Sequence, residues 1–234
     1  MQTELNFNYI SPVRKYLDKE IGEWAAYITN ETLEKTYSIL RYINKFADVE
    51  NYYPERKDVF RIYKDVKLEN IKVVILGTSP SAYGNSNGYA FGCKETIDKT
   101  LEIVYSSIIK TCPKKQLVYT DKGLEYLVKQ GVFLLNTNLT TERSVNNSHK
   151  KLGWKYLINN TIDIINNNRD FIVWILWGSE VKKYKKRIDN NTHLILTNTH
   201  PSSVIYNKTD WDCNDFNECN NFLEGCQINK IKWR

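Results

Sequence analysis

The sequence predicts an α/β fold of three layers (α/β/α), in which a central four-stranded, mainly parallel sheet lies between layers of helices. Four short apolar runs recur along the chain, and each is long enough for one buried strand. Helical stretches separate these runs, which is the alternation expected of a parallel sheet. The length of 234 residues and the hydrophobic content of 41% agree with a globular domain of this class.

The N-terminal part, residues 1–60, is expected to be a helical layer of a single domain that spans residues 1–234. Between Pro12 and Phe46, apolar side chains recur at steps of three and four residues, as on one face of a helix. The polar segment that begins at Asn51 contains a proline and ends this layer.

The four predicted strands lie in the rest of the chain. Ile, Val and Leu dominate each run, which is typical of strands buried on both faces of a parallel sheet. The runs are 71–77, 131–136, 171–178 and 193–200. A helix over 155–166 precedes the third of them. Each run ends in a polar or glycine-bearing turn, and because ligands bind at the carboxyl ends of parallel strands, we expect the four turns to form one site.

Charge and cysteine content exclude some classes of protein. The 33 Lys and Arg against 27 Asp and Glu give a net charge of +6, which permits a polyanionic partner without requiring one. The five cysteines are an odd number and contain no CxxC pair, so we expect reduced thiols rather than a disulfide framework or a zinc ribbon. No run approaches the roughly 20 apolar residues of a membrane span, and no secretory signal is evident, so we expect an intracellular protein without a membrane partner.

Several motifs, in order along the chain, resemble those of the family-1 uracil-DNA glycosylases. The matching segments, with the family's motif in parentheses, are 73–82 (VVILGQDPYH), 88–91 (HGLAF), 131–140 (GVLLLN and LT), 147–154 (NSHK and GW), 177–179 (WGS), 200–203 (HPSP) and 213–220 (C, F and N of the closing helix). The resemblance covers nearly the whole chain. It implies the fold of that family and an enzyme that excises a base from DNA by hydrolysis of the N-glycosidic bond.

The resemblance implies a pocket for one base that has been flipped out of the DNA stack. Asn136 would pair with the Watson–Crick edge of uracil through its side-chain amide, and Phe91 would stack on the base. His200, as a neutral imidazole, would donate a hydrogen bond to uracil O2 and stabilise the departing anion. Thr78 and Ser81 would complete the base pocket.

A second set of residues is implied to hold DNA. Small residues in two loops let the backbone approach the phosphates, an apolar side chain enters the base stack, and a basic side chain contacts a phosphate. The loop residues are Gly178, Ser179, Pro201 and Ser202, the apolar wedge is Val204 and the basic residue is Lys208.

The first motif departs from the family pattern, with Thr-Ser-Pro-Ser-Ala at 78–82 in place of Gln-Asp-Pro-Tyr-His, and two of these four changes bear on the chemistry. Ser79 stands where the family has the catalytic Asp that orients the attacking water, so we expect a lower rate unless another acid replaces it. Glu95 and Glu142 are the nearest acidic candidates in sequence. Ser81 stands where the family has a Tyr that closes the pocket against C5 of the pyrimidine, so we expect bases larger than uracil to enter.

Two classes of function follow. The first is a glycosylase that excises uracil or a C5-substituted pyrimidine and needs no cofactor and no metal. The alternative is a catalytically impaired DNA-binding protein that serves as a replication, processivity or damage-sensing subunit. A nucleotide-binding protein on the same frame is a third interpretation. The expected partner is single- or double-stranded DNA, with a replication protein as a further candidate, and we expect a monomer located at DNA, in the nucleus or the cytoplasm of a cellular or viral source.

Overall fold

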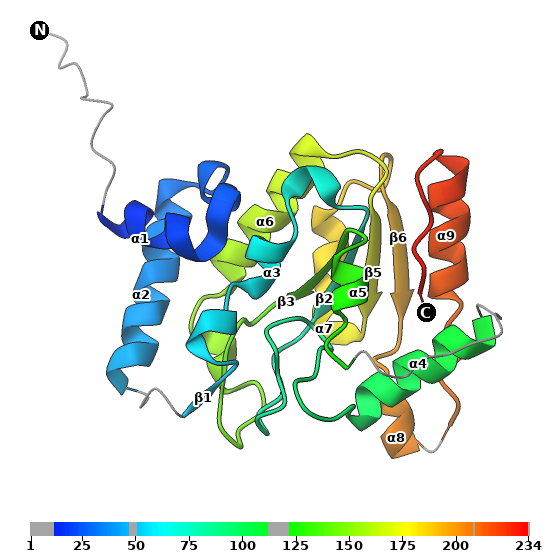
Figure 1. The fold of residues 1–234 in the computed structure, drawn as a ribbon, viewed down its shortest axis with the longest axis horizontal. Helices are drawn as coiled ribbons and strands as arrows, with labels where there is room; N and C mark the ends of the chain where they lie inside the picture. Colours follow the sequence, from blue (N-terminus) through cyan, green and yellow to red (C-terminus); the bar gives the residue numbers. More distant parts are fainter. Residues whose placement is uncertain (1–11, 47–50, 112–121, 208, 234) are drawn as a thin grey trace, which may run out of the picture.

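A parallel sheet of four strands forms the centre of the fold (Figure 1). The computed structural model describes residues 12–46, 51–111, 122–207 and 209–233. The strands, in their order across the sheet, are β3 (Val132–Asn136), β2 (Val73–Gly77), β5 (Val173–Trp177) and β6 (Leu194–Asn198). All three pairings between neighbours are parallel. The predicted fold class is confirmed, and each strand lies within one of the four apolar runs.

The register aligns the carboxyl ends of the strands. Gly77 lies opposite Asn136, and Trp177 lies opposite Asn198. Every residue of β2, β3 and β5 is buried, whereas the edge strand β6 is only partly buried. The turns that follow these strands therefore meet at one edge of the sheet.

Helices flank the sheet on two sides in Figure 1. On one side lie α1 (Pro12–Ile21), α2 (Asn30–Phe46), α3 (Arg61–Asp65) and α6 (Lys155–Asn168). On the other lie α4 (Lys99–Thr111) and α9 (Asp215–Gly225), and α9 contacts β5 and β6. Shorter helices are α5 (Glu125–Val128), α7 (Ser179–Lys182) and α8 (Ser203–Asn207). A small antiparallel sheet pairs β1 (Tyr52–Tyr53) with β4 (Thr141–Glu142).

One tryptophan joins the N-terminal helices to the sheet. Trp24 lies in the 3₁₀ helix Gly22–Ala26 between α1 and α2 and is completely buried. Its ring packs against Tyr63 of α3 and Phe133 of β3, with ring centroids 5.4 and 5.1 Å away. Its indole N–H donates to the carbonyl of Val66 at 2.9 Å.

That residues 1–234 form one domain stays a prediction.

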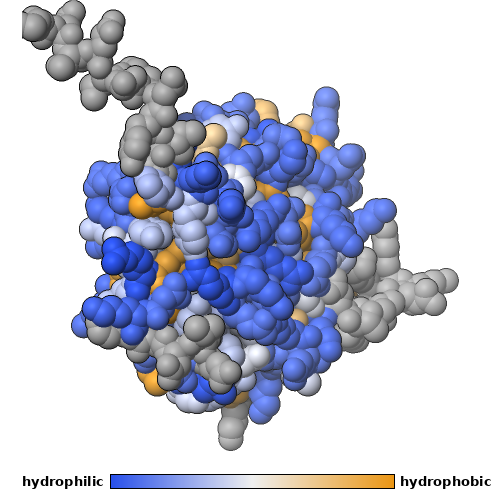
Figure 2. Space-filling view, turned by 60° about the vertical axis from the view of Figure 1, so that its left-hand side comes forward, coloured by the Kyte–Doolittle hydropathy of each residue, from blue (hydrophilic) through white to orange (hydrophobic). Residues whose placement is uncertain are grey.

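One face of the molecule is mainly polar. Figure 2 shows a face on which hydrophilic side chains predominate and hydrophobic ones form only small patches. Among the described helices, none combines the length and the apolar character that crossing a bilayer requires. The described cysteines Cys93, Cys213, Cys219 and Cys226 form no disulfide with one another, and Cys112 lies outside the described residues. Within the same part of the chain, no group of three acidic, His or Cys side chains is placed to hold a metal ion.

Two tryptophans of β5 allow a test of one buried hydrogen bond. The Trp177 indole N–H donates to Oδ2 of Asp215 at 2.6 Å, whereas the Trp174 indole N–H has no hydrogen-bond partner among the described residues. We expect Trp177→Phe to lower the free energy of unfolding by about 1–3 kcal/mol more than Trp174→Phe, because only the first leaves a buried carboxyl without its donor. Urea denaturation measures both variants, and equal losses would contradict this account.

Candidate functional site

A pocket of about 460 Å³ opens at the carboxyl ends of β2 and β3. Its walls come from the turn after β2, the end of β3, the loop before α4 and the turn after β6. We call it the base pocket. It brings together seven residues that the sequence analysis assigned to a site: Thr78, Ser79, Ser81, Phe91, Asn136, His200 and Ser202. Their roles stay predictions.

Asn136 is the last residue of β3 and only 3% of it is exposed. Its side-chain amide makes no hydrogen bond to another described residue, although buried polar groups are usually paired. The opposite residue, Gly77, makes room for it, because a Cβ on Gly77 would lie 2.4 Å from Oδ1 of Asn136. A buried amide with free donors and an acceptor is therefore available to a ligand in the base pocket.

Phe91 forms an aromatic wall of the base pocket. Its backbone has a φ of +64°, which is uncommon for a residue other than glycine. Residues with such backbone angles are often found at functional sites. The ring is half-buried and lies 5.8 Å from the ring of His200 and 5.5 Å from that of Trp177, measured between centroids. A flat ligand that enters the pocket would meet this ring.

His200 is held as a neutral imidazole with a defined proton position. Burial lowers the pKa of His200, and this effect outweighs the opposing influence of the Asp98 carboxylate. The backbone N–H of Ser202 donates to Nδ1 at 3.2 Å, and the Ser202 hydroxyl lies 2.7 Å from the same atom. Because Nδ1 accepts, the proton of the neutral ring is on Nε2, which is free to donate.

Ser79 is paired with a residue that the sequence analysis left without a role. Its hydroxyl donates to Oδ1 of Asn147 at 2.8 Å, and both residues line the base pocket. Asn147 has a φ of +58° and precedes the 3₁₀ helix Ser148–Lys151. Its place in the NSHK motif was the available signal. With its proton donated to Asn147, the Ser79 oxygen can still accept a hydrogen bond from water.

Comparisons with known proteins agree with these motifs. The family model described as "Uracil DNA glycosylase superfamily" matches residues 63–224. The uracil-DNA glycosylase of Francisella tularensis subsp. holarctica (strain LVS) is 38% identical over 187 residues, which cover 77% of this chain and 83% of that protein. The chain belongs to the uracil-DNA glycosylase superfamily. The family and the enzyme class predicted from the motifs, a hydrolytic DNA N-glycosylase, are confirmed.

Solved structures show the fold of the same superfamily. The crystal structure of mimivirus uracil-DNA glycosylase has a TM-score of 0.71 at 20% identity and covers 97% of this chain and 95% of that chain. The UNG of Nitratifractor salsuginis has a TM-score of 0.55 at 15% identity, with 86% and 94% covered. The relatives therefore include bacterial and viral proteins.

The acidic residues that line the base pocket are not the two candidates that the sequence analysis named. Neither Glu95 nor Glu142 lines the pocket, so proximity in sequence identified the wrong candidates. The pocket carboxylates are Asp98 and Glu180. Glu180 is neutralised by two lysines, whereas the described contacts give Asp98 no cation; its Oδ1 accepts the N–H of Leu101 at 2.8 Å, at the start of α4.

Of the described residues assigned to DNA contact, Ser202 lines the base pocket and the others do not. Gly178 precedes α7 with a φ of +97°, and a Cβ there would lie 3.0 Å from Cβ of His200. Ser179 begins α7, and Pro201 is buried.

Val204, the predicted wedge, lies in α8, where it is half-buried and packs against the core. Its neighbour Ile205 is 40% exposed. The adjacent residue is thus the more accessible apolar side chain of α8. Lys208 lies outside the described residues. The DNA contacts of this loop stay predictions.

The hydrogen bonds at Nδ1 predict how His200 titrates. We expect Ser202→Ala to raise the His200 pKa toward its usual value, because the lost hydroxyl donor stabilises the neutral ring. NMR titration measures this pKa, and the chain has only three histidines to assign. Ser203→Ala is the matched control, since the Ser203 hydroxyl bonds only to the His200 carbonyl at 2.7 Å. Equal pKa values in both variants would contradict the assignment.

Proposed function

We propose that the base pocket of this chain binds a uracil flipped out of DNA and hydrolyses its N-glycosidic bond. The observation that carries the proposal is the common pocket of three groups, the Asn136 amide, the Phe91 ring and the His200 imidazole. The relatives named uracil-DNA glycosylases support the same reaction. DNA is then the substrate and the place of action.

Recognition of the base rests on Asn136 and Phe91. The Asn136 carbonyl would accept from uracil N3–H while its NH₂ donates to O4, which satisfies an amide that has no partner among the described residues. Phe91 would stack on the base, a contact worth about 1–3 kcal/mol. The two hydrogen bonds of Asn136 distinguish uracil from cytosine, because cytosine has an acceptor at N3 and an amino donor in place of O4.

Departure of the base rests on His200. As the bond to the sugar breaks, negative charge develops on the uracil, and Nε2–H of a neutral His200 would donate to O2. A preorganised donor of this kind typically contributes about 10²–10³ in rate. Because the neutral ring stabilises the anion by hydrogen bonding, activity should persist until the pH falls to the lowered pKa of His200.

Two different residues would orient the attacking water and stabilise the positive charge that develops on the sugar. Ser79, which donates its proton to Asn147, would accept a hydrogen bond from the attacking water and orient it. Ser79 has no charge to favour the cationic sugar, so we assign that task to Asp98, a pocket carboxylate without a described cation partner. The fixed geometry at the start of α4 holds this carboxylate in position.

The alternative is a DNA-binding subunit of a replication or damage-sensing assembly. One observation favours it, the uncharged residue at position 79 of the first motif. The unpaired amide of Asn136 favours the enzyme, because a scaffold does not need a group that reads a base. We retain a monomer as the expected state.

The enzyme and the alternative differ in an excision assay. We expect wild type to release uracil from single- and double-stranded oligonucleotides, and Asp98→Asn to slow release at least tenfold. The asparagine keeps the hydrogen bond to the N–H of Leu101 and removes only the charge. Alkaline cleavage of the abasic product measures the rate.

Glu95→Gln is the matched control, because it removes an exposed carboxylate outside the pocket. We expect it to retain the wild-type rate, and we expect Ser79→Asp to restore part of the activity of Asp98→Asn. Equal rates for wild type and Asp98→Asn would reject the role of Asp98. DNA binding without any release of uracil by wild type would establish the alternative function.

Ser81 predicts a broad choice of base. A small residue at this wall leaves room for a C5 substituent, so wild type should also release 5-hydroxymethyluracil. We expect Ser81→Tyr to raise the ratio of uracil to 5-hydroxymethyluracil release about tenfold or more, because the ring fills this space. Single-turnover rates on both substrates measure the ratio, and an unchanged ratio would show that another group limits the size of the base.

A further inference from the structure

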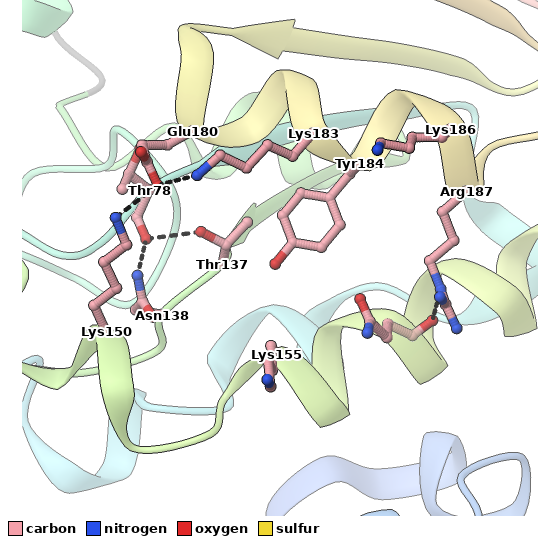
Figure 3. Close-up of a pocket in the computed structure, with 11 residues that line it drawn as sticks. Thr78, Thr137, Asn138, Lys150, Lys155, Glu180, Lys183, Tyr184, Lys186 and Arg187 are labelled. Carbon is pink, nitrogen blue, oxygen red and sulfur yellow. Dashed lines mark hydrogen bonds and ion pairs between the residues drawn. The ribbon is translucent and has the colours of Figure 1, made fainter.

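A second pocket lies beside the base pocket and shares Thr78 and Glu180 with it. It encloses about 440 Å³ between α6 and the helical segment that contains α7 and the 3₁₀ helix Lys183–Arg187 (Figure 3). Five cationic side chains line it: Lys150, Lys155, Lys183, Lys186 and Arg187. We call it the basic pocket.

Positive charge in the basic pocket exceeds what nearby carboxylates neutralise. Glu180, the one acidic side chain among the described lining residues, forms ion pairs with Lys150 at 2.8 Å and Lys183 at 2.9 Å, and Arg187 pairs with Asp163 at 2.7 Å. Lys155 and Lys186 form no ion pair with any described residue. The surplus charge favours an anionic ligand.

Uncharged polar side chains contribute to the remaining walls of the basic pocket. At the floor, the Thr137 hydroxyl and the Asn138 amide donate to the Thr78 carbonyl, each at 3.0 Å, and so hold the turn after β2. Tyr184 extends into the pocket in Figure 3, and its hydroxyl has no hydrogen bond to a described residue. Burial raises the pKa of Tyr184, so the hydroxyl keeps its proton and can donate.

We propose that the basic pocket binds a phosphodiester group of the DNA strand whose flipped base occupies the base pocket. This inference rests on the proposed function. The two pockets share the turn at Thr78, so a strand that enters one passes the other. The ammonium groups of Lys155 and Lys186 and the hydroxyl of Tyr184 supply the donors for the phosphate oxygens.

The basic pocket adds cationic side chains to the predicted DNA loops, in which Lys208 is the one charged residue assigned to a phosphate. Gly178, Ser179 and Ser202 are uncharged and would contact phosphates only through backbone and hydroxyl groups. Release of counterions needs cationic side chains near the strand. Much of the salt dependence of DNA binding is therefore assigned to the basic pocket.

The test compares two double variants of the whole chain. Lys155→Ala/Lys186→Ala removes the unpaired cations of the basic pocket. Lys19→Ala/Lys129→Ala removes two exposed lysines outside both pockets. Fluorescence anisotropy with a labelled single-stranded oligonucleotide that lacks uracil gives Kd at several salt concentrations.

We expect the pocket variant to bind about tenfold more weakly at low salt, with a slope of log K against log salt that is shallower by about 0.7 for each lost phosphate contact. The control variant should bind within about twofold of wild type. Lys155→Arg/Lys186→Arg keeps both charges and should retain binding, which separates loss of charge from loss of structure.

Each other outcome overturns the inference. If wild type excises uracil and both alanine variants bind DNA equally, the basic pocket does not hold the strand while the proposed function stands. If wild type neither binds DNA nor excises uracil, the proposed function fails as well. If the pocket variant loses only the binding of free thymidine monophosphate, measured by calorimetry, the occupant is a free nucleotide.

Discussion

The close approach of Asn136 to Gly77 is the constraint on which the base pocket depends. The two residues end neighbouring parallel strands in register, and any side chain at position 77 would collide with the Asn136 amide. Glycine at the end of β2 thus allows a polar side chain to remain buried at the end of β3. The register of β2 and β3 therefore fixes the position of the Asn136 amide, and the other lining residues complete the base pocket.

The charged groups at the site do not lie where the first motif of the family would place them. The pocket lacks a carboxylate at position 79, yet Asp98 lines it from the start of α4. His200 is kept neutral by burial, despite the nearby negative charge. Glu180 stands between the base pocket and the basic pocket with a lysine on each side, so it balances part of the positive charge there. Asp98 therefore lies in the base pocket, the five cationic side chains lie in the basic pocket, and Glu180 lines both.

The similarity to the family model does not extend over the whole chain. The family model covers residues 63–224, which contain all four strands of the central sheet and every lining residue of the base pocket. The helices α1 and α2 lie before this segment, but Trp24 between them packs on Phe133 of β3. Their contact with the sheet is a buried aromatic cluster, whose packing depends on shape and apolar area more than on any single residue type.

The sequence by itself determined the sheet and the motif turns, because continuous apolar runs and the glycines and polar residues that end them are local signals. For the same reason it placed Asn136 at the end of β3 and His200 just after β6, whereas Phe91, in the loop between β2 and α4, was identified only through the motif resemblance. It could not identify Asp98 instead of Glu95, three residues earlier, because only the folded loop decides which carboxylate faces the pocket. The bond between Ser79 and Asn147, 68 residues apart, and the basic pocket join distant segments, and such contacts exist only once the strands have brought their turns together.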